Sequence, residues 1–269
     1  MNTLLKSIAV AGLASLALST VAAAQTLDAV KERGKIIVGI QGDNPPYGFL
    51  DSQGQNDGYD AGVARLLGEY LGLPVEFNIV TNQNRIAALQ TNRVDVIFAT
   101  LSMTAERAEA LQYTKPYAEQ PFYVLAPKDM EVTGVEDLAG KRIGVPRGAI
   151  MDLQLTALAT ESEILRFDDD SSNVQALLSG QVDAIGGSMF YEERLNQQAD
   201  GKFENKFSTG SLYVGAGTRL NDAEWTKTLN AFLDDATANG KLGELYQKWF
   251  SMDLPEMTTP VEGVNWTLE

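Results

Sequence analysis

Strand-like and helix-like segments alternate along almost the entire chain, and this alternation constrains the fold more than any other feature. Short runs rich in β-branched residues at 35–40, 75–80 and 94–98 are typical of strands. Between the first two, Asp60 can cap a helix whose apolar side chains recur at helical spacing over 63–71. A chain that alternates in this way predicts a parallel α/β sheet.

The alternation occurs in two sets that echo each other. Residues 88–95 and 176–183 each contain a helix end, a polar turn and a strand beginning with the dipeptide Val-Asp. The two sets also begin alike, at 35–39 and 141–145. Chance similarity of two helix-to-strand junctions is the alternative, but the matching starts favour a chain of two lobes.

Two segments without a helical or alternating pattern connect the sets. Residues 116–121 predict a first crossing between lobes, and residues 211–217 predict an extended return crossing. We therefore expect lobe 1 to comprise residues 25–119 and 214–269, and lobe 2 to comprise residues 120–213. Two crossings imply a hinge, and a cleft that closes around a ligand is a common use of such a hinge.

The first 24 residues have the layout of a secretory signal peptide. Lys6 supplies the positive charge, residues 8–21 form an apolar run too short to span a bilayer comfortably, and 22–24 offer a small-residue cleavage site. We expect cleavage after Ala24, and an uncleaved N-terminal anchor is the alternative. Because the chain has no cysteine to carry a lipid, the predicted product is a soluble periplasmic protein.

The composition favours binding over catalysis. A formal net charge of −15 argues against nucleic acid or anionic membrane surfaces as partners. The absence of cysteine and histidine removes thiolate zinc sites, the commonest general base and the commonest transition-metal ligand. We expect no metal and no cofactor, and any catalysis would rely on carboxylates, lysine, tyrosine or serine.

The candidate site lies in the loops that follow the strands, because ligands of open α/β sheets bind beyond the carboxyl ends of the strands. Residues 100–107 are the sharpest candidate: Thr104 can cap a helix whose first N–H groups, with the planar fork of Arg107, suit a carboxylate. The alternative is that Arg107 pairs with Glu106 or Glu109 on a solvated face. The other candidate loops are 43–49, 147–150 and 186–188.

Two motifs are fairly specific, Gly58-Tyr59-Asp60 and the Thr-x-x-Arg segment 104–107. With shorter motifs at 38–39, 46–49 and 239–250, they resemble the polar amino-acid-binding proteins of ABC importers, the bacterial solute-binding proteins of family 3. The resemblance covers nearly all of the chain after residue 24. It implies an α/β, two-lobed periplasmic-binding-protein fold of type II, with two crossing strands as a hinge and a ligand cleft between the lobes.

The resemblance also implies roles for residues of the first lobe. Arg107 would bind the α-carboxylate of the ligand, helped by Thr100 and by the backbone at Ser102. Tyr47, with Phe49 as second choice, would stack on the ligand side chain. The alternative for Tyr47 is a structural aromatic residue after the Pro-Pro turn.

In the second lobe, the resemblance implies backbone donors at Ala149 and Ile150 near the carboxylate. Arg147 could reach into the cleft or be a solvated surface charge. One departure concerns Ser188, which stands where the family commonly has an Asp that holds the ligand ammonium. Gln41 similarly stands near a position where the family often has Asp.

This departure leaves the ligand open, because a buried ammonium without a carboxylate partner is costly. Either another acid supplies the charge, with Asp43, Glu119 and Glu192 as candidates, or the ligand is not an ordinary α-amino acid. With Arg107 and Arg147 as candidate cations, a carboxylate-bearing ligand is expected.

The predicted function is therefore that of a periplasmic, non-enzymatic receptor that delivers a small polar amino acid or related carboxylate to an inner-membrane ABC permease. The alternative is a dehydratase- or lyase-like enzyme on the same scaffold, with Glu119 or Glu192 as acid or base. A sensor module that works with a partner receptor is a third possibility. We expect a monomer that does not bind nucleic acid.

Overall fold

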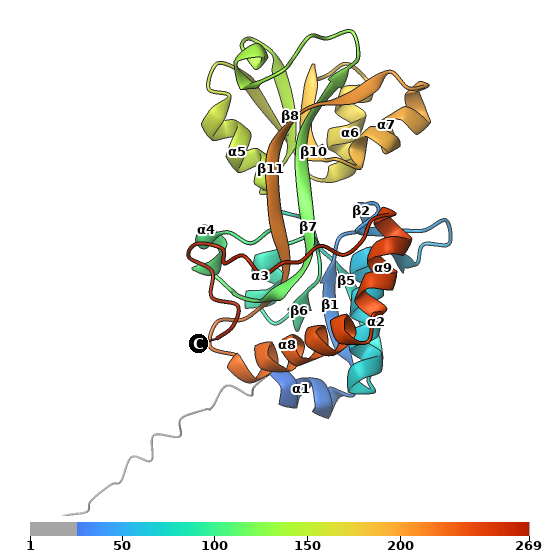
Figure 1. The fold of residues 1–269 in the computed structure, drawn as a ribbon, viewed down its shortest axis with the longest axis vertical. Helices are drawn as coiled ribbons and strands as arrows, with labels where there is room; N and C mark the ends of the chain where they lie inside the picture. Colours follow the sequence, from blue (N-terminus) through green and yellow to red (C-terminus); the bar gives the residue numbers. More distant parts are fainter. Residues whose placement is uncertain (1–25, 269) are drawn as a thin grey trace, which may run out of the picture.

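The computed structural model describes residues 26–268, and over this range the chain forms two lobes joined by two long strands (Figure 1). The strands are β7 (Gln112–Pro127) and β11 (Phe203–Thr218), which pair antiparallel along most of their length. They contain the predicted crossings, and the predicted lobe boundaries fall inside them. The predicted signal peptide, residues 1–24, and its cleavage site after Ala24 lie outside the described residues.

One eight-stranded sheet runs through both lobes, with the strand order β5-β1-β6-β11-β7-β10-β8-β9. In lobe 1, β1 (Ile36–Ile40) pairs in parallel with β5 (Val75–Ile79) and with β6 (Val96–Ile97). A separate small sheet in this lobe consists of β2 (Asp43–Asn44), β3 (Gly48–Leu50) and β4 (Asn56–Asp57).

In lobe 2, β8 (Arg142–Pro146) pairs in parallel with β9 (Glu163–Phe167) and with β10 (Ala184–Ser188). Strand β10 also pairs antiparallel with β7, so the two crossing strands form the middle of the sheet. The predicted two-lobed α/β architecture, with parallel strands in each lobe, is confirmed.

Helices connect the strands in both lobes (Figure 1). The helices of lobe 1 are α1 (Thr26–Arg33), α2 (Tyr59–Leu71), α3 (Arg85–Gln90), α4 (Ala105–Ala108), α8 (Ala223–Ala238) and α9 (Lys241–Phe250). Those of lobe 2 are the 3-10 turn η1 (Val135–Leu138), α5 (Ile150–Leu158), α6 (Asp170–Leu178) and α7 (Tyr191–Ala199). Helix α4 comprises only about one turn.

The two Val-Asp junctions that echo each other in the sequence have the same local structure. The carboxylate of Asp95 accepts a hydrogen bond from the backbone N–H of Ile37 on β1, at 2.7 Å. The carboxylate of Asp183 accepts one from the backbone N–H of Arg142 on β8, at 2.8 Å. In each lobe the aspartate therefore ties the turn after a helix to the first strand, which explains why both junctions carry this residue.

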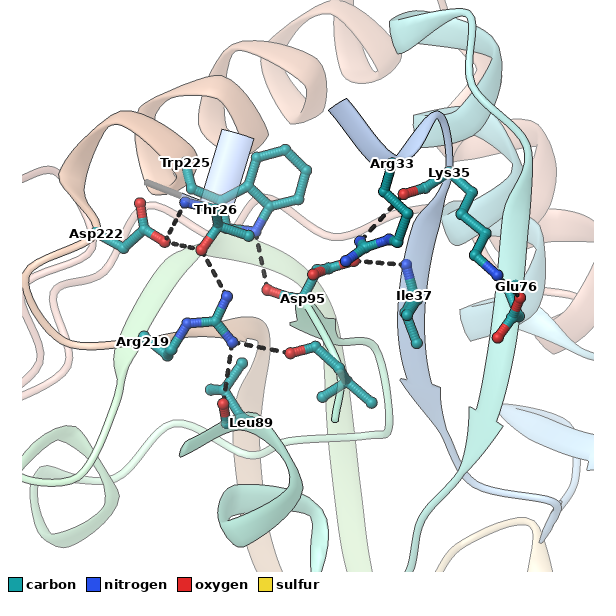
Figure 2. Close-up of polar contacts among 11 residues, drawn as sticks. Thr26, Arg33, Lys35, Ile37, Glu76, Leu89, Asp95, Arg219, Asp222 and Trp225 are labelled. Atoms are coloured by element: carbon teal, nitrogen blue, oxygen red, sulfur yellow. Dashed lines mark hydrogen bonds and ion pairs between the residues drawn. The ribbon is translucent and has the colours of Figure 1, made fainter. Parts of the chain in front are cut away.

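The junction of lobe 1 carries additional contacts from the last part of the chain (Figure 2). The indole N–H of Trp225, a fully buried side chain on α8, donates to the carbonyl of Asp95 at 3.0 Å. Arg219 donates to the carbonyls of Leu89 and Val94, at 3.0 and 2.9 Å. The segment after β11 is thereby fastened to lobe 1.

Candidate functional site

A small cavity lies where the two lobes meet, and both lobes contribute to its wall. Lobe 1 supplies residues from the loops that follow β1, β5 and β6, and β7 supplies two residues at the crossing. Lobe 2 supplies the ends of β8 and β10 and residues from the segments that follow β8, β9 and β10. The lining residues are Gln41, Asn44, Asn82, Arg85, Thr100, Ser102, Gln120, Phe122, Pro146, Ala149, Ile150, Met151, Asp170, Gly186, Gly187, Ser188 and Tyr191.

Arg85, the first residue of α3, is the cation in this wall, and its side chain is fully buried. One terminal nitrogen, Nη1, donates to the carbonyls of Ala99 and Thr100 at 2.5 and 3.3 Å. Its Nε has no partner among the described residues. Burial, with a smaller contribution from Arg107, lowers the pKa of Arg85 to about 9. A buried guanidinium with an unpaired N–H is well suited to receive an anion.

Arg107 lies close to this wall but is not part of it. Thr104 caps α4 as predicted, since its hydroxyl accepts the backbone N–H of Arg107 at 3.2 Å. The buried guanidinium donates to the carbonyl of Ser102 at 3.0 Å and to the carbonyl of Gly148 at 3.1 Å. Because Gly148 belongs to lobe 2, this side chain connects the two lobes rather than pairing with a glutamate on its own helix.

The loop that carries Thr100 is held by Asp60. Thr100 has a φ of 50°, a left-handed conformation that is unfavourable for a β-branched residue. Its backbone N–H and its hydroxyl both donate to one carboxylate oxygen of Asp60, at 2.9 and 3.1 Å. The hydroxyl of Tyr117 donates to the other oxygen at 2.8 Å. Burial raises the pKa of Asp60 to about 6. Asp60 therefore positions the cavity wall, whereas the sequence predicts only a helix cap, a place taken by Gly58.

The two aromatic residues expected to stack on a ligand lie outside the cavity wall. Tyr47 is fully buried, and its ring packs against Phe250 of lobe 1 and Phe190 of lobe 2, at centroid distances of 4.9 and 5.9 Å. Phe49 packs against Trp249 at 5.7 Å. The chain reverses between β2 and β3, so these rings face the aromatic core, while Asn44 of the same loop lines the cavity.

In lobe 2, three of the four expected residues line the cavity: Ala149, Ile150 and Ser188. Arg147 does not. It is half-buried, and its backbone N–H donates to the carbonyl of Phe167 at 2.8 Å. The structure thus brings Thr100 and Ser102 of lobe 1 into one wall with Ala149, Ile150 and Ser188 of lobe 2.

The acid in the wall is Asp170, the first residue of α6, which the sequence analysis did not select. Its carboxylate is buried and accepts hydrogen bonds from the side-chain amides of Gln41 and Asn82, at 2.9 and 3.0 Å, and from the hydroxyl of Tyr191. Burial, with a smaller contribution from the charge of Asp43, raises the pKa of Asp170 to about 6.

The three acids that the sequence favoured lie elsewhere. The carboxylate of Asp43 accepts the backbone N–H of Ser171 at 2.8 Å, and that of Glu192 accepts the backbone N–H of Asn205 at 3.0 Å. Glu119 accepts a hydrogen bond from the hydroxyl of Ser211. None of the three is part of the cavity wall formed by the described residues.

Known proteins match this chain along most of its length. Residues 36–252 match the model of the bacterial extracellular solute-binding proteins, family 3. The chain belongs to this family. It is 30% identical to the glutamine-binding protein of an ABC transporter from Bacillus subtilis, over 86% of each chain. It is 26% identical to an L-cystine-binding protein of Escherichia coli, over 94% of this chain and 96% of the relative.

Solved structures show the same architecture. A solute receptor for L-cysteine from Neisseria gonorrhoeae superposes with a TM-score of 0.79 at 28% identity, over 84% of this chain and 93% of that one. The likeness includes both lobes. Within residues 26–268, no helix combines the length and the apolar character that crossing a membrane requires.

Proposed function

We propose that the chain is the periplasmic substrate-binding component of an ABC importer, and that it captures a small amino acid in the cavity between its lobes. The observation that carries this proposal is the wall itself, in which a buried cation, Arg85, and a buried anion, Asp170, come from opposite lobes. The glutamine- and cystine-binding relatives support an amino acid as the ligand and a permease as the partner.

Each charged group has a role in this proposal. Arg85 binds the ligand carboxylate through its unpaired N–H, and Arg107, near enough to influence it, adds a second cation. Thr100 and Ser102 complete the carboxylate site from lobe 1, and Ala149 and Ile150 approach it from lobe 2 with Ser188 beside them. Tyr47, Phe49 and Arg147 have no place in this contact set.

Closure of the lobes is the proposed mechanism. Contacts such as Arg107 to Gly148 and Gln41 to Asp170 exist only when the lobes meet, so a ligand that touches both walls stabilises the closed state. The ligand shifts the open–closed equilibrium by its differential affinity for the closed form.

The proposal includes no catalysis. Glu119 and Glu192, the candidates for an enzymatic acid or base, are hydrogen-bonded elsewhere and lie outside the wall. It does include export by a signal peptide that is cleaved after Ala24, with no lipid anchor, since the sequence contains no cysteine.

Titration calorimetry of the mature protein against the twenty L-amino acids and a set of small organic acids tests the proposal. We expect at least one amino acid to bind with micromolar or tighter affinity and to be recovered unchanged. Arg85→Ala should then abolish detectable binding. Silence across the whole panel, or formation of a product, would overturn the proposed function.

A further inference from the structure

The end of β10 is chemically neutral in this chain. Gly186, Gly187 and Ser188 line the cavity there, and none of them carries a charge. Asp170 is the one acidic side chain among the described residues of the wall. A cationic group inside the cavity would therefore have a single carboxylate to pair with, and this carboxylate is on α6 instead of β10.

Donors from both lobes fix Asp170 in place. The two amides that donate to Oδ2, from Gln41 and Asn82, belong to lobe 1, whereas the Tyr191 hydroxyl that donates to Oδ1 belongs to lobe 2. All three donors are neutral, and Asp170 makes no ion pair within the described chain. The carboxylate is thus oriented by hydrogen bonds but lacks a directly paired cation, which is costly for a buried charge.

The glycine before Ser188 is part of the same arrangement. A Cβ added at Gly187 would lie 2.3 Å from Cε2 of Tyr191, closer than any real contact allows. Only glycine leaves room for this ring, and the ring carries the hydroxyl that orients Asp170. The missing side chain at Gly187 on β10 therefore makes room for the tyrosine that orients Asp170 on α6.

We propose that Asp170 binds the ammonium group of the ligand, so that the ligand is a zwitterionic α-amino acid and not an amine-free carboxylate. This inference rests on the proposed function, because it assumes that Arg85 receives the carboxylate of the same ligand. The two buried, oppositely charged side chains in one wall match the two charges of a zwitterion.

The same wall also predicts which side chains are selected. Once Asp170 is engaged by the α-ammonium, no second carboxylate among the described lining residues is left for a cationic side chain. L-lysine and L-arginine should accordingly bind more weakly than amino acids with uncharged side chains of similar length.

Paired ligands that differ only in the α-amino group provide the test. Calorimetry would compare L-glutamine with glutaramate, and L-cysteine with 3-mercaptopropionate, on the wild-type protein and on Asp170→Asn. We expect the wild type to prefer the amino acid of the pair that it binds. Asp170→Asn should weaken that amino acid roughly 10- to 100-fold, the loss of one charge-assisted contact, and should largely remove the preference over the analogue.

Asp43→Asn is the matched control, because Asp43 also touches the beginning of α6 but lies outside the cavity wall. It should retain the preference for the amino acid. Unfolding of each ligand-free variant verifies that it folds. If the wild type binds an amino acid but Asp170→Asn keeps the full preference, or if the wild type prefers the analogue, the inference is wrong while the proposed function stands. Binding of no amino acid at all would instead contradict the proposed function.

Discussion

The two Val-Asp junctions are the same local structure in two different environments. The side chain of Asp95 is 6% exposed and that of Asp183 is 31% exposed, although both accept a hydrogen bond from the first strand of their lobe. Burial raises the pKa of Asp95, whereas hydrogen bonds from Arg142 lower the pKa of Asp183. In lobe 1, Trp225 of α8 covers the junction, and its indole N–H donates to the carbonyl of Asp95 (Figure 2). The repeated motif therefore forms the same hydrogen bond to the backbone in both lobes, while the surroundings of each aspartate determine the free-energy cost of its charge.

Removing Trp225, which covers the junction of lobe 1, should have the largest effect on stability. Trp225→Ala deletes a fully buried indole and its hydrogen bond to Asp95, so we expect the free energy of unfolding to fall by about 3–5 kcal/mol. Urea unfolding followed by circular dichroism measures this loss. Trp249→Ala, at a partly buried tryptophan of α9, is the control and should cost clearly less. Equal losses would mean that the cover over Asp95 is not special.

The junction aspartates should differ in the same direction. Asp95→Ala leaves the N–H of Ile37 and the guanidinium of Arg33 without their carboxylate, and we expect a loss of about 1–3 kcal/mol. Asp183→Ala exposes its partners to water and should cost about 1 kcal/mol or less. Urea midpoints of the two variants decide this, and a larger loss in lobe 2 would reverse the comparison.

The equivalent glycines of β1 and β8 offer a steric version of the comparison. A Cβ at Gly144 would lie 2.5 Å from Oδ1 of Asn173. One at Gly39 would meet methyl groups of Val94 at 3.4 Å and of Val80 at 3.6 Å, which are ordinary contacts. We expect Gly144→Ala to destabilise the protein by about 1–3 kcal/mol and Gly39→Ala to cost less than about 1 kcal/mol. Thermal unfolding of both variants is the measurement, and equal shifts in Tm would contradict it.

The smallest effect concerns pH, where the two aspartates should have opposite signs. The folded-state pKa of Asp95 is raised, so its contribution to stability increases as pH falls from 7 through that pKa. The folded-state pKa of Asp183 is lowered, so its contribution is present above the unfolded value of 3.8 and is lost as pH falls below it.

Urea unfolding of wild type, Asp95→Asn and Asp183→Asn between pH 7 and pH 3 separates these contributions. As pH falls, the free energy of unfolding of the wild type should rise relative to that of Asp95→Asn. At the lowest pH it should fall relative to that of Asp183→Asn. The same sign for both differences would show that the two environments are electrostatically alike.

Much of the fold could be predicted from the sequence because its signals are local. The apolar period of α2, the helix ends before the Val-Asp pairs and the capping hydroxyl of Thr104 each depend on neighbouring residues only. Their repetition is sufficient to predict two lobes. The exact limits of the strands depend on tertiary contacts, so local signals predict them less accurately.

The site was harder to predict because it depends on how the lobes meet. Arg85 and Asp170 follow β5 and β9, so the strand-end rule applied to every strand would have found both. Whether Tyr47 or Asn44 of one loop faces the cavity depends on the reversal between β2 and β3, which residue types alone do not encode. Asp60 was assigned to a cap because its partner, Thr100, is forty residues away in the sequence.

The paired strands β7 and β11 have a mechanical consequence. Since they stay hydrogen-bonded through the crossing, any change in the angle between the lobes must deform both strands together. We expect the pairing to deform most easily at its register shifts, including the one next to Gly210. In the proposed closure mechanism, the stiffness of this ribbon contributes to the free-energy difference between the open and closed forms. Affinity can therefore be tuned by residues that never touch the solute.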